Sequence, residues 1–212
     1  MITSVSQHTN AAISGNKEVL RDIHIAEKNI AIYQRDIQLL SEDLQQLSDQ
    51  KVECRVRGSV EEVLSGLKAY FSDNFPTCSA LIEDISERLA QFEEISQASS
   101  FRLLLSTVST NMCRKFHTDV NDMRMLCTYV GPGTLWVPDK AIDLDASYAR
   151  GNGKEIVIDL EKVEQVGTGD VVILKGALYP EANAIMHRSP TIEESGEKRL
   201  LLRIDTHQIF GS

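Results

Sequence analysis

A change of pattern near Ser99 constrains the fold of this chain more than any other feature. Beyond it, short apolar and β-branched segments alternate with clusters of Gly, Pro, Asn and Asp, such as GPGT, RGNGK and GTGD. The predicted strands are the segments FRLLLSTVS, MRMLCTYV, TLWVP, EIVIDL, DVVILKG and KRLLLRID. Strands at this short spacing predict a small barrel or sandwich over residues 99–212.

Residues 18–98 have a different, mainly helical pattern. Between Val19 and Leu47, apolar residues recur at intervals of three and four, which predicts an amphipathic helix with a nearly heptad repeat. We interpret this helix as packed on its own domain, with a homodimer through residues 19–50 as the alternative. The segment NIAIY is equally compatible with a strand, so helix and strand both stay open for residues 23–35.

Two further helices and one strand are predicted in the same region. The segment VECRVRGS alternates and ends in Gly58, which indicates a short strand. Ser59 is the expected N-cap of the next helix, because Glu61 and Glu62 precede its apolar positions. The segment TCSALIEDISERLAQF has apolar residues at helical spacing, with Thr77 as the expected cap. These helices are expected to cover one outer face of the barrel.

The charge balance and the cysteines exclude several classes of protein. The formal net charge is −9 at pH 7, so the chain lacks the basic field that draws proteins to nucleic acid or acidic membranes. The four cysteines form no CxxC pair, which fits neither a disulfide framework nor a zinc ribbon. Residues 1–17 are polar and are expected to form a disordered tail. With no signal peptide or membrane span recognised, we expect a cytoplasmic protein without nucleic-acid or membrane partners.

A candidate metal site begins with His117 and Asp119, two residues apart in the segment CRKFHTDVND. In a strand, side chains at i and i+2 project from one face, so an imidazole and a carboxylate would lie side by side. His187 follows a later apolar strand, and a barrel mouth would bring it back to this pair. Two histidines and one carboxylate, with other coordination positions open, form the facial triad of non-heme Fe(II) oxygenases. We therefore predict that His117, Asp119 and His187 bind one metal.

The last predicted strand supplies candidate ligand-binding residues. In RLLLRID, Arg199 and Arg203 share one face with Asp205, while the apolar residues share the other. An arginine on a barrel-lining face needs a partner, because an unpaired buried charge is strongly destabilising. A ligand carboxylate held by two hydrogen bonds is such a partner, and an ordinary ion pair with Asp205 is the alternative. Tyr129 and Thr134 are further candidates for contacts to that carboxylate.

The order of these motifs resembles the Fe(II)/2-oxoglutarate-dependent oxygenases with a double-stranded β-helix. His-x-Asp is followed by GDVVILKG, by HRSP with His187, and by Arg199 twelve residues on. The resemblance implies an α+β chain with a C-terminal double-stranded β-helix, a jelly-roll or cupin-like barrel, over residues 99–212, and N-terminal helices packed on its outer face. It further implies that His117, Asp119 and His187 bind Fe(II) and that Arg199 binds the far carboxylate of 2-oxoglutarate, with Arg203 as the alternative anchor.

A closer resemblance is to an uncharacterised bacterial family of unknown function, carried by CRKFHTD, RMLCTYVGPGTLWVP and HRSP. It implies a site and no reaction, so the substrate, a small molecule or a protein side chain, stays open.

Cys113 separates two candidate functions. In a regular strand it would share the face of His117 and Asp119, and a thiolate there would complete the closed ligand set that zinc prefers. A small buried core residue is the alternative reading of this cysteine. The first function is a dioxygenase that depends on Fe(II) and 2-oxoglutarate. The second is a non-catalytic, cupin-like metal-binding protein, such as a zinc carrier or sensor.

Overall fold

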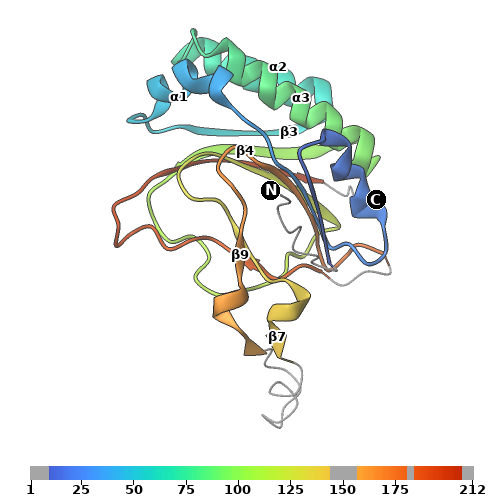
Figure 1. Ribbon diagram of the computed structural model, residues 1–212. Helices are drawn as coiled ribbons and strands as arrows, with labels where there is room; N and C mark the ends of the chain where they lie inside the picture. The colour runs from blue at the N-terminus through green and yellow to red at the C-terminus, as the bar shows by residue number, and fades with distance from the viewer. Residues whose placement is uncertain (1–9, 144–156, 181–183, 207–212) are drawn as a thin grey trace.

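One large sheet organises the computed structural model, which describes residues 10–143, 157–180 and 184–206 (Figure 1). Within these residues, seven strands pair in the order β1-β2-β10-β5-β12-β4-β3. The pair β1 and β2 is parallel, and the other neighbours are antiparallel. The strands are Ala11–Ser14 (β1), Ile30–Tyr33 (β2), Glu53–Gly58 (β3), Phe101–Val108 (β4), Met123–Val130 (β5), Val171–Lys175 (β10) and Arg199–Thr206 (β12).

Smaller elements lie on one side of this sheet. A second sheet pairs its three strands in the order β11-β6-β9, and β7 pairs with β8. Figure 1 shows β7 and β9 on the side of the large sheet away from the long helices. These elements are Leu135–Trp136 (β6), Ile142–Asp143 (β7), Val157–Ile158 (β8), Glu164–Gln165 (β9) and His187–Arg188 (β11), with the short 3-10 helices Asp139–Ala141 (η3) and Leu160–Lys162 (η4).

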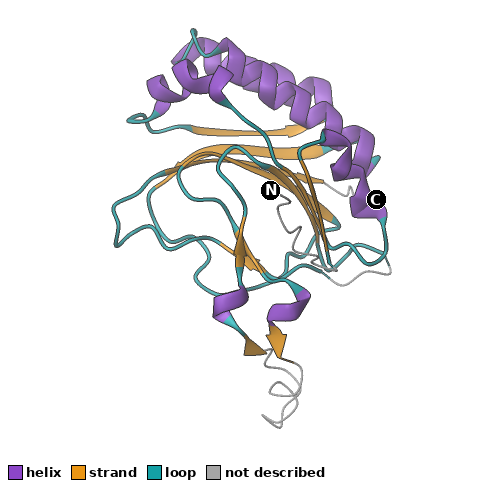
Figure 2. Ribbon diagram, viewed as in Figure 1, coloured by secondary structure: helices purple, strands orange, loops and turns teal. Residues whose placement is uncertain are grey.

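The longer helices cover the opposite face of the large sheet (Figures 1 and 2). They are α1 (Ser41–Leu47), α2 (Val60–Asn74) and α3 (Ser79–Ser96), and the 3-10 helices η1 (Lys17–His24) and η2 (Gln38–Leu40) precede them in the chain. None of the described helices has the length and apolar character needed to cross a membrane. The chain is therefore an α+β protein dominated by one sheet.

Alternation along β12 divides the core into two clusters. Leu200, Leu202 and Ile204 belong to the cluster between the sheet and the helices, together with residues such as Phe92 of α3. Leu201 belongs to a second cluster on the other face, with apolar residues of β5, β6 and β10. The period-two pattern of RLLLRID thus fixes which side chains face the helices and which face the small sheets.

Helix α2 begins where the sequence predicts. The Ser59 hydroxyl accepts a hydrogen bond from the Glu62 amide, and the Glu62 carboxylate accepts one from the Ser59 amide, which forms a capping box. The expected cap of α3 is wrong. Cys78 occupies that position without a side-chain hydrogen bond to the first amides of the helix, and Thr77 instead donates to Gln46.

The long N-terminal helix expected over residues 19–47 is wrong. The structure divides this stretch into η1, β2, η2 and α1. Residues Ile30–Tyr33 form a strand because both edges find partners, β1 and β10, and Ile30, Ala31 and Ile32 are buried. A coiled-coil seam over residues 19–50 therefore has no continuous helix to form it. The expected tail is also wrong from Ala11 on, because Ala11–Ser14 is β1; residues 1–9 lie outside the described residues.

The strands expected beyond Ser99 are present, with EIVIDL represented by β8 in the part that is described.

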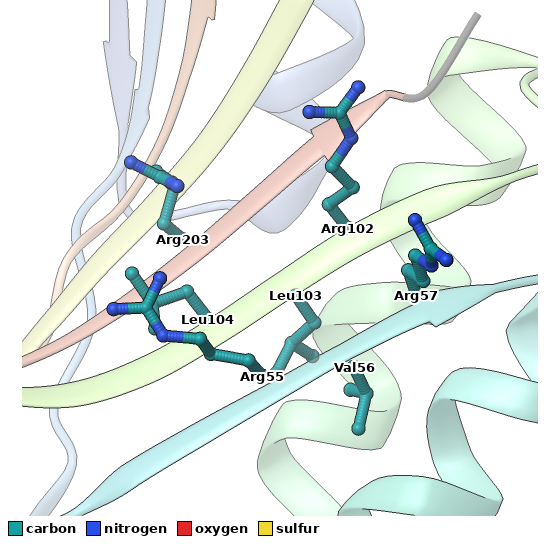
Figure 3. Close-up of a pocket in the computed structure, with 7 residues that line it drawn as sticks. All are labelled: Arg55, Val56, Arg57, Arg102, Leu103, Leu104 and Arg203. Atoms are coloured by element: carbon teal, nitrogen blue, oxygen red, sulfur yellow. The ribbon is translucent and has the colours of Figure 1, made fainter.

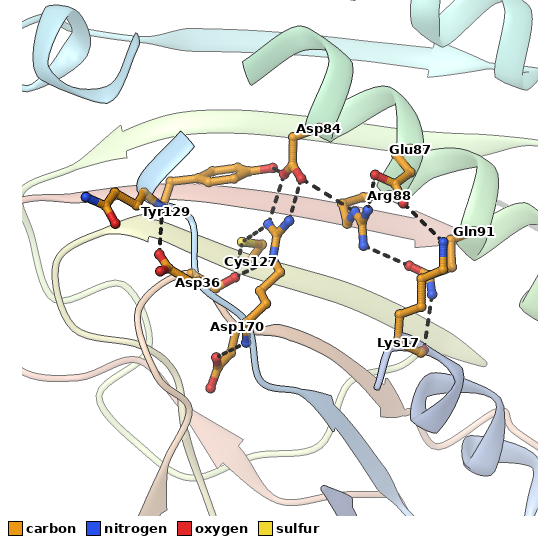
Figure 4. Close-up of polar contacts among 12 residues, drawn as sticks. Lys17, Asp36, Asp84, Glu87, Arg88, Gln91, Cys127, Tyr129 and Asp170 are labelled. Atoms are coloured by element: carbon orange, nitrogen blue, oxygen red, sulfur yellow. Dashed lines mark hydrogen bonds and ion pairs between the residues drawn. The ribbon is translucent and has the colours of Figure 1, made fainter. Parts of the chain in front are cut away.

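A buried polar network joins the sheet to α3 (Figure 4). The Arg35 guanidinium forms an ion pair with Asp84, and the Tyr129 hydroxyl donates to Asp84 Oδ2 at 2.7 Å. Arg88 Nε lies 3.8 Å from Asp84 Oδ1. Burial opposes ionisation of Asp84, but Arg35, Tyr129 and Arg88 together outweigh it, so the pKa of Asp84 lies below its ordinary value.

We expect Asp84→Asn to lower the free energy of unfolding at pH 7 by about 3 to 5 kcal/mol, because the buried Arg35 guanidinium loses its anion, while Arg88 keeps its ion pair with Glu87. Since the folded-state pKa of Asp84 is depressed, its stabilisation is complete above the unfolded-state pKa of about 3.9 and is lost as the pH falls through the folded value. Urea denaturation from pH 7 to pH 3 should show the difference from the wild type shrinking. Glu18→Gln, at an exposed ion pair with Arg21, should change stability by no more than about 1 kcal/mol. Equal losses in both variants would contradict the prediction.

Candidate metal centre

The segment that carries His117 and Asp119 is a loop, and the expected strand over it is wrong. Its one ladder contact in the described residues is an isolated antiparallel bridge between His117 and His187. The His117 amide donates to the His187 carbonyl at 3.0 Å, and the His187 amide donates to the His117 carbonyl at 2.9 Å. These two hydrogen bonds hold the histidines side by side although they are far apart in sequence. The proximity therefore arises from backbone pairing between a loop and β11.

The structure brings all three predicted ligands together. One ligand atom each from His117, Asp119 and His187 lies within 4.8 Å of the other two. His187 Nε2 is 3.3 Å from Asp119 Oδ2, and His117 Nε2 is 3.7 Å from Asp119 Oδ1. His187 is buried in β11, where it pairs with the buried Trp136, and His117 is partly exposed. The cluster therefore has a closed side toward the core and an open side toward solvent.

Backbone carbonyls set the orientation of both imidazoles. His117 Nδ1 lies 3.1 Å from the Lys115 carbonyl, and His187 Nδ1 lies 3.2 Å from the Ile185 carbonyl. A carbonyl oxygen only accepts hydrogen bonds, so Nδ1 carries the proton in each ring. Nε2 is then left with a lone pair that faces Asp119. Metal-binding histidines are commonly fixed in this way by a hydrogen bond from the other ring nitrogen.

Asp119 is held ionised at the centre of the cluster. Arg124 Nη1 lies 2.5 Å from Asp119 Oδ2, and Arg124 Nε lies 2.5 Å from Asp205 Oδ1. Burial opposes ionisation, but His187, Arg124 and His117 together outweigh it and keep the pKa of Asp119 below its ordinary value. Asp119 Oδ2 is buried; it forms the ion pair with Arg124 and lies near His187 Nε2, but it accepts no hydrogen bond of good geometry from the described residues. A carboxylate oxygen has two lone pairs, so Oδ2 can still coordinate a metal ion beside the two imidazoles.

The loop beyond Asp119 is anchored by a turn that follows β10. The Ala177 amide donates to the Asp119 carbonyl at 2.8 Å, and the Gly176 amide donates to the Asp122 carbonyl at 2.8 Å. A side chain at position 176 would collide with Asn121, because a Cβ there would lie 2.2 Å from its carbonyl oxygen. Gly176 thus permits the close approach that fixes this loop.

Arg199 is buried on the same sheet face as the candidate metal centre. Its Nη2 donates to Thr128 Oγ1 at 3.1 Å, its Nε has no hydrogen bond, and no described carboxylate lies within ion-pair distance. Burial lowers the pKa of Arg199 to about 10, so the group stays charged at neutral pH. The alternative ion pair with Asp205 is wrong, because that carboxylate binds Arg124 and Arg203. Arg199 is therefore a buried cation without an anion among the described residues.

The other predicted ligand contacts lie elsewhere. Tyr129 projects to the opposite face, into the helix-side cluster, where its hydroxyl donates to Asp84, so its expected role at this site is wrong. Arg203 is one-third exposed and pairs with Asp205 at 3.1 Å. Thr134 is buried just before β6. Cys113 is exposed and stands outside the ligand cluster, so its reading as a buried core residue is wrong, and its thiol is not among the grouped ligand atoms.

Sequence reasoning missed Arg124, which links Asp119 to Asp205. The signal was present in MRMLCTY, because alternation places Arg124 on the same face as Leu126 and Thr128. Its partner in the loop could not be inferred, since the loop has no periodic pattern.

Comparison with known proteins gives one family match. Residues 14–205 match the model of a family described as a protein of unknown function (DUF1826). This match confirms the resemblance to an uncharacterised family. No match to the chain is found among the curated proteins.

Several solved structures resemble the chain at low identity. A Pseudomonas putida prolyl-4-hydroxylase shares 8% identity at a TM-score of 0.42, with 90% of this chain and 97% of that chain covered. A full-length Neurospora crassa protein in complex with alpha-KG shares 12% identity at a TM-score of 0.45, with 95% and 85% covered. A bsmA homolog from Methylobium petroleophilum shares 10% identity at a TM-score of 0.45, with 92% and 94% covered. At these identities and TM-scores the likenesses carry no conclusion about reaction or substrate.

We expect the metal-free protein to bind one equivalent of Co(II), measured by isothermal titration calorimetry. His187→Ala should abolish this binding, because it removes the buried ligand, whereas Cys113→Ala should bind normally. When the free metal concentration is 100 times the dissociation constant, metal binding should add about 2.7 kcal/mol to the free energy of unfolding, and a chelator should remove that gain. Loss of binding in Cys113→Ala would contradict this assignment and favour the closed thiolate set.

Proposed function

We propose that this chain, which belongs to the DUF1826 family, is a non-heme Fe(II) oxygenase that uses 2-oxoglutarate. The observation that carries the proposal is the pairing of two features on one face of the large sheet. His117, Asp119 and His187 offer three ligand atoms within 4.8 Å, and Arg199 offers a buried guanidinium without an anion among the described residues. Neither feature alone distinguishes an oxygenase from a metal-storage protein.

The donor set fits Fe(II). Two imidazole nitrogens and one carboxylate are the ligands of the facial triad, which leaves positions open for further ligands. His187 Nε2 faces Asp119 Oδ2 and His117 Nε2 faces Asp119 Oδ1, so the carboxylate and both imidazoles present ligand atoms to one point. The closed, thiolate-containing set that zinc prefers receives no support from the geometry, because Cys113 is exposed and outside the cluster.

The surroundings of Arg199 fit the distal carboxylate of 2-oxoglutarate. A guanidinium binds a carboxylate by two parallel hydrogen bonds, and Thr128 already fixes one edge of this guanidinium. On β5, Thr128 stands four residues from Arg124, which is about 13 Å of strand, and Leu126 lies between them on the same face. Gly131, with φ +80°, permits the backbone to approach β12 closely beside Arg199, because a Cβ there would lie 2.2 Å from the Lys198 carbonyl oxygen and 3.2 Å from Arg199 Cγ. The anchor and the metal ligands thus bracket one apolar stretch of the sheet.

We also propose that the large sheet and the β11-β6-β9 sheet are the two walls of a double-stranded β-helix. Support comes from the second apolar cluster, which joins Leu126, Val172 and Leu201 of the large sheet to Trp136 of the small one. His187 and Arg199 lie on strands that contribute to opposite walls. In this arrangement the metal and the 2-oxoglutarate anchor would occupy the space between the walls.

Each residue then has a defined task in the reaction. Bound Fe(II) with 2-oxoglutarate supplies the oxidising chemistry that amino-acid side chains lack. The Lys115 and Ile185 carbonyls orient the two imidazoles, and Arg124 holds Asp119 ionised. Trp136 and Leu126 form an apolar lining that excludes water. The substrate that enters from the open side is a small molecule or a protein side chain.

We expect the Co(II)-loaded protein to bind 2-oxoglutarate, and Arg199→Gln to weaken that binding by about a hundredfold without changing metal affinity, because a charge-assisted bidentate contact is lost. Calorimetry measures both affinities. Arg203→Gln, on the same strand and face, is the matched control and should retain binding. With Fe(II) and O2, the wild type should convert 2-oxoglutarate to succinate, detected by mass spectrometry.

Two outcomes would count against the oxygenase. Metal binding without any 2-oxoglutarate binding would favour the non-catalytic metal-binding protein. Loss of binding in Arg203→Gln but not in Arg199→Gln would transfer the anchor to the other arginine.

A further inference from the structure

An open surface pocket on the face of the large sheet away from the helices is lined by four arginines. Its volume is about 360 Å³, and its lining comes from β3, β4 and β12: Arg55, Val56, Arg57, Arg102, Leu103, Leu104 and Arg203 (Figure 3). Volumes of this order are typical of sites for small molecules. The chain as a whole has a net charge of −9, so this concentration of positive charge runs against its overall balance. We refer to this site as the arginine pocket.

The register of the sheet explains why the four arginines meet. Arg57 stands directly opposite Arg102, and Arg102 directly opposite Asp205. In the next row, Leu104 separates Arg55 from Arg203. Like charges directly opposite each other on neighbouring strands are destabilising. This gathering of arginines over three strands is therefore stabilised when an anion binds there.

The carboxylates beside the pocket are shared or exposed. Asp205 forms ion pairs with both Arg203 and Arg124, and Glu53 pairs with Arg55 at an exposed edge. Arg57 has no ion pair with a described residue. The Arg57 guanidinium therefore retains donors for a ligand, and Arg203 Nε has no hydrogen bond of good geometry with the described residues. Their planar forks match the oxygens of a phosphoryl group better than a single ammonium would.

We propose that the arginine pocket binds the phosphoryl group of a small-molecule substrate, which rests on the proposed function of the metal centre. The chemical class is a phosphorylated metabolite with an oxidisable carbon at some distance from the phosphate. The pocket suits a compact group with two negative charges, which several guanidiniums can neutralise together.

The sheet connects this pocket to the metal centre. Asp205 stands opposite Arg102 on one side and Arg124 on the other, and Arg124 binds the candidate metal ligand Asp119. From Arg57 to Arg124 there are three strand spacings, about 14 Å. A substrate anchored by its phosphate would cross β4 and β12 and present a carbon to the metal. The continuous ion-pair chain Arg203–Asp205–Arg124–Asp119 makes the two sites parts of one surface.

The test uses the metal-free full chain and inorganic pyrophosphate as the probe, with binding measured by isothermal titration calorimetry at low ionic strength. We expect one binding site, and Arg57→Gln and Arg55→Gln should each weaken it by about tenfold, as expected for the loss of charge-assisted hydrogen bonds. Arg21→Gln, at an exposed residue of helix η1, is the control for general charge loss and should leave the affinity unchanged. Circular dichroism checks that each variant is folded.

Two further variants distinguish the arginine pocket from the 2-oxoglutarate site and from the metal centre. Arg199→Gln should keep its pyrophosphate affinity, and His187→Ala should keep it while losing metal. Failure of the oxygenase reaction with pyrophosphate binding intact would overturn the proposed function alone. Pyrophosphate binding that depends on Arg199 and not on Arg57 would overturn the pocket.

Two competing ligands complete the test. Citrate should bind more weakly than pyrophosphate, and equal or tighter binding of citrate would overturn the phosphoryl assignment. A ten-nucleotide single strand that binds far more tightly than pyrophosphate would show that the pocket serves a polymer and would overturn the small-molecule proposal.

Discussion

The pairing of β12 between β5 and β4 is the constraint on which the rest of the structure depends. Because side chains alternate along a strand, this one central strand contributes to both faces of the sheet. Leu202 and Ile204 pack against the helices, and Arg199, Arg203 and Asp205 face the other way. A register slip by one residue would bury the charges under α3 and expose the leucines. The helix-side core therefore holds the charged face in register.

The two faces of the sheet differ in how their buried arginines are paired with negative charge. On the helix side, Asp84 meets Arg35 and Arg88, so each buried charge has an opposite charge nearby. On the other side, Arg199 has only the Thr128 hydroxyl among the described residues. A buried charge left in this condition is costly unless something else supplies its partner. The contrast supports the proposed ligand-binding face without reference to any other protein.

Local sequence signals explain which parts of the structure could be predicted. Strands β4, β5, β10 and β12 are apolar or alternating and bounded by turn residues, whereas β2 is a strand only because it pairs with β1 and the distant β10. His117 and Asp119 were expected on a strand, but they lie on a loop fixed by two hydrogen bonds to His187 and by the turn at Gly176. The order of the motifs predicts that the three ligands lie close together. The structure reaches this proximity through a loop instead of the expected strand. Arg124 and the arginine pocket could not be found, since their partners depend on sheet register, which no single segment reveals.

The placement of charge across this face separates two kinds of anion site. Arg199 is buried and, in the proposed function, suits a carboxylate that is fully removed from water. Arg55, Arg57 and Arg102 are exposed toward the sheet edge, where a bound phosphoryl group would keep part of its hydration. Arg124, which holds Asp119, ends the cross-strand row that begins at Arg57, whereas Arg199 lies at the opposite end of β12 from Asp205. A co-substrate held by Arg199 would therefore reach the metal along the strands and a substrate held in the arginine pocket across them, which lets one enter while the other is bound.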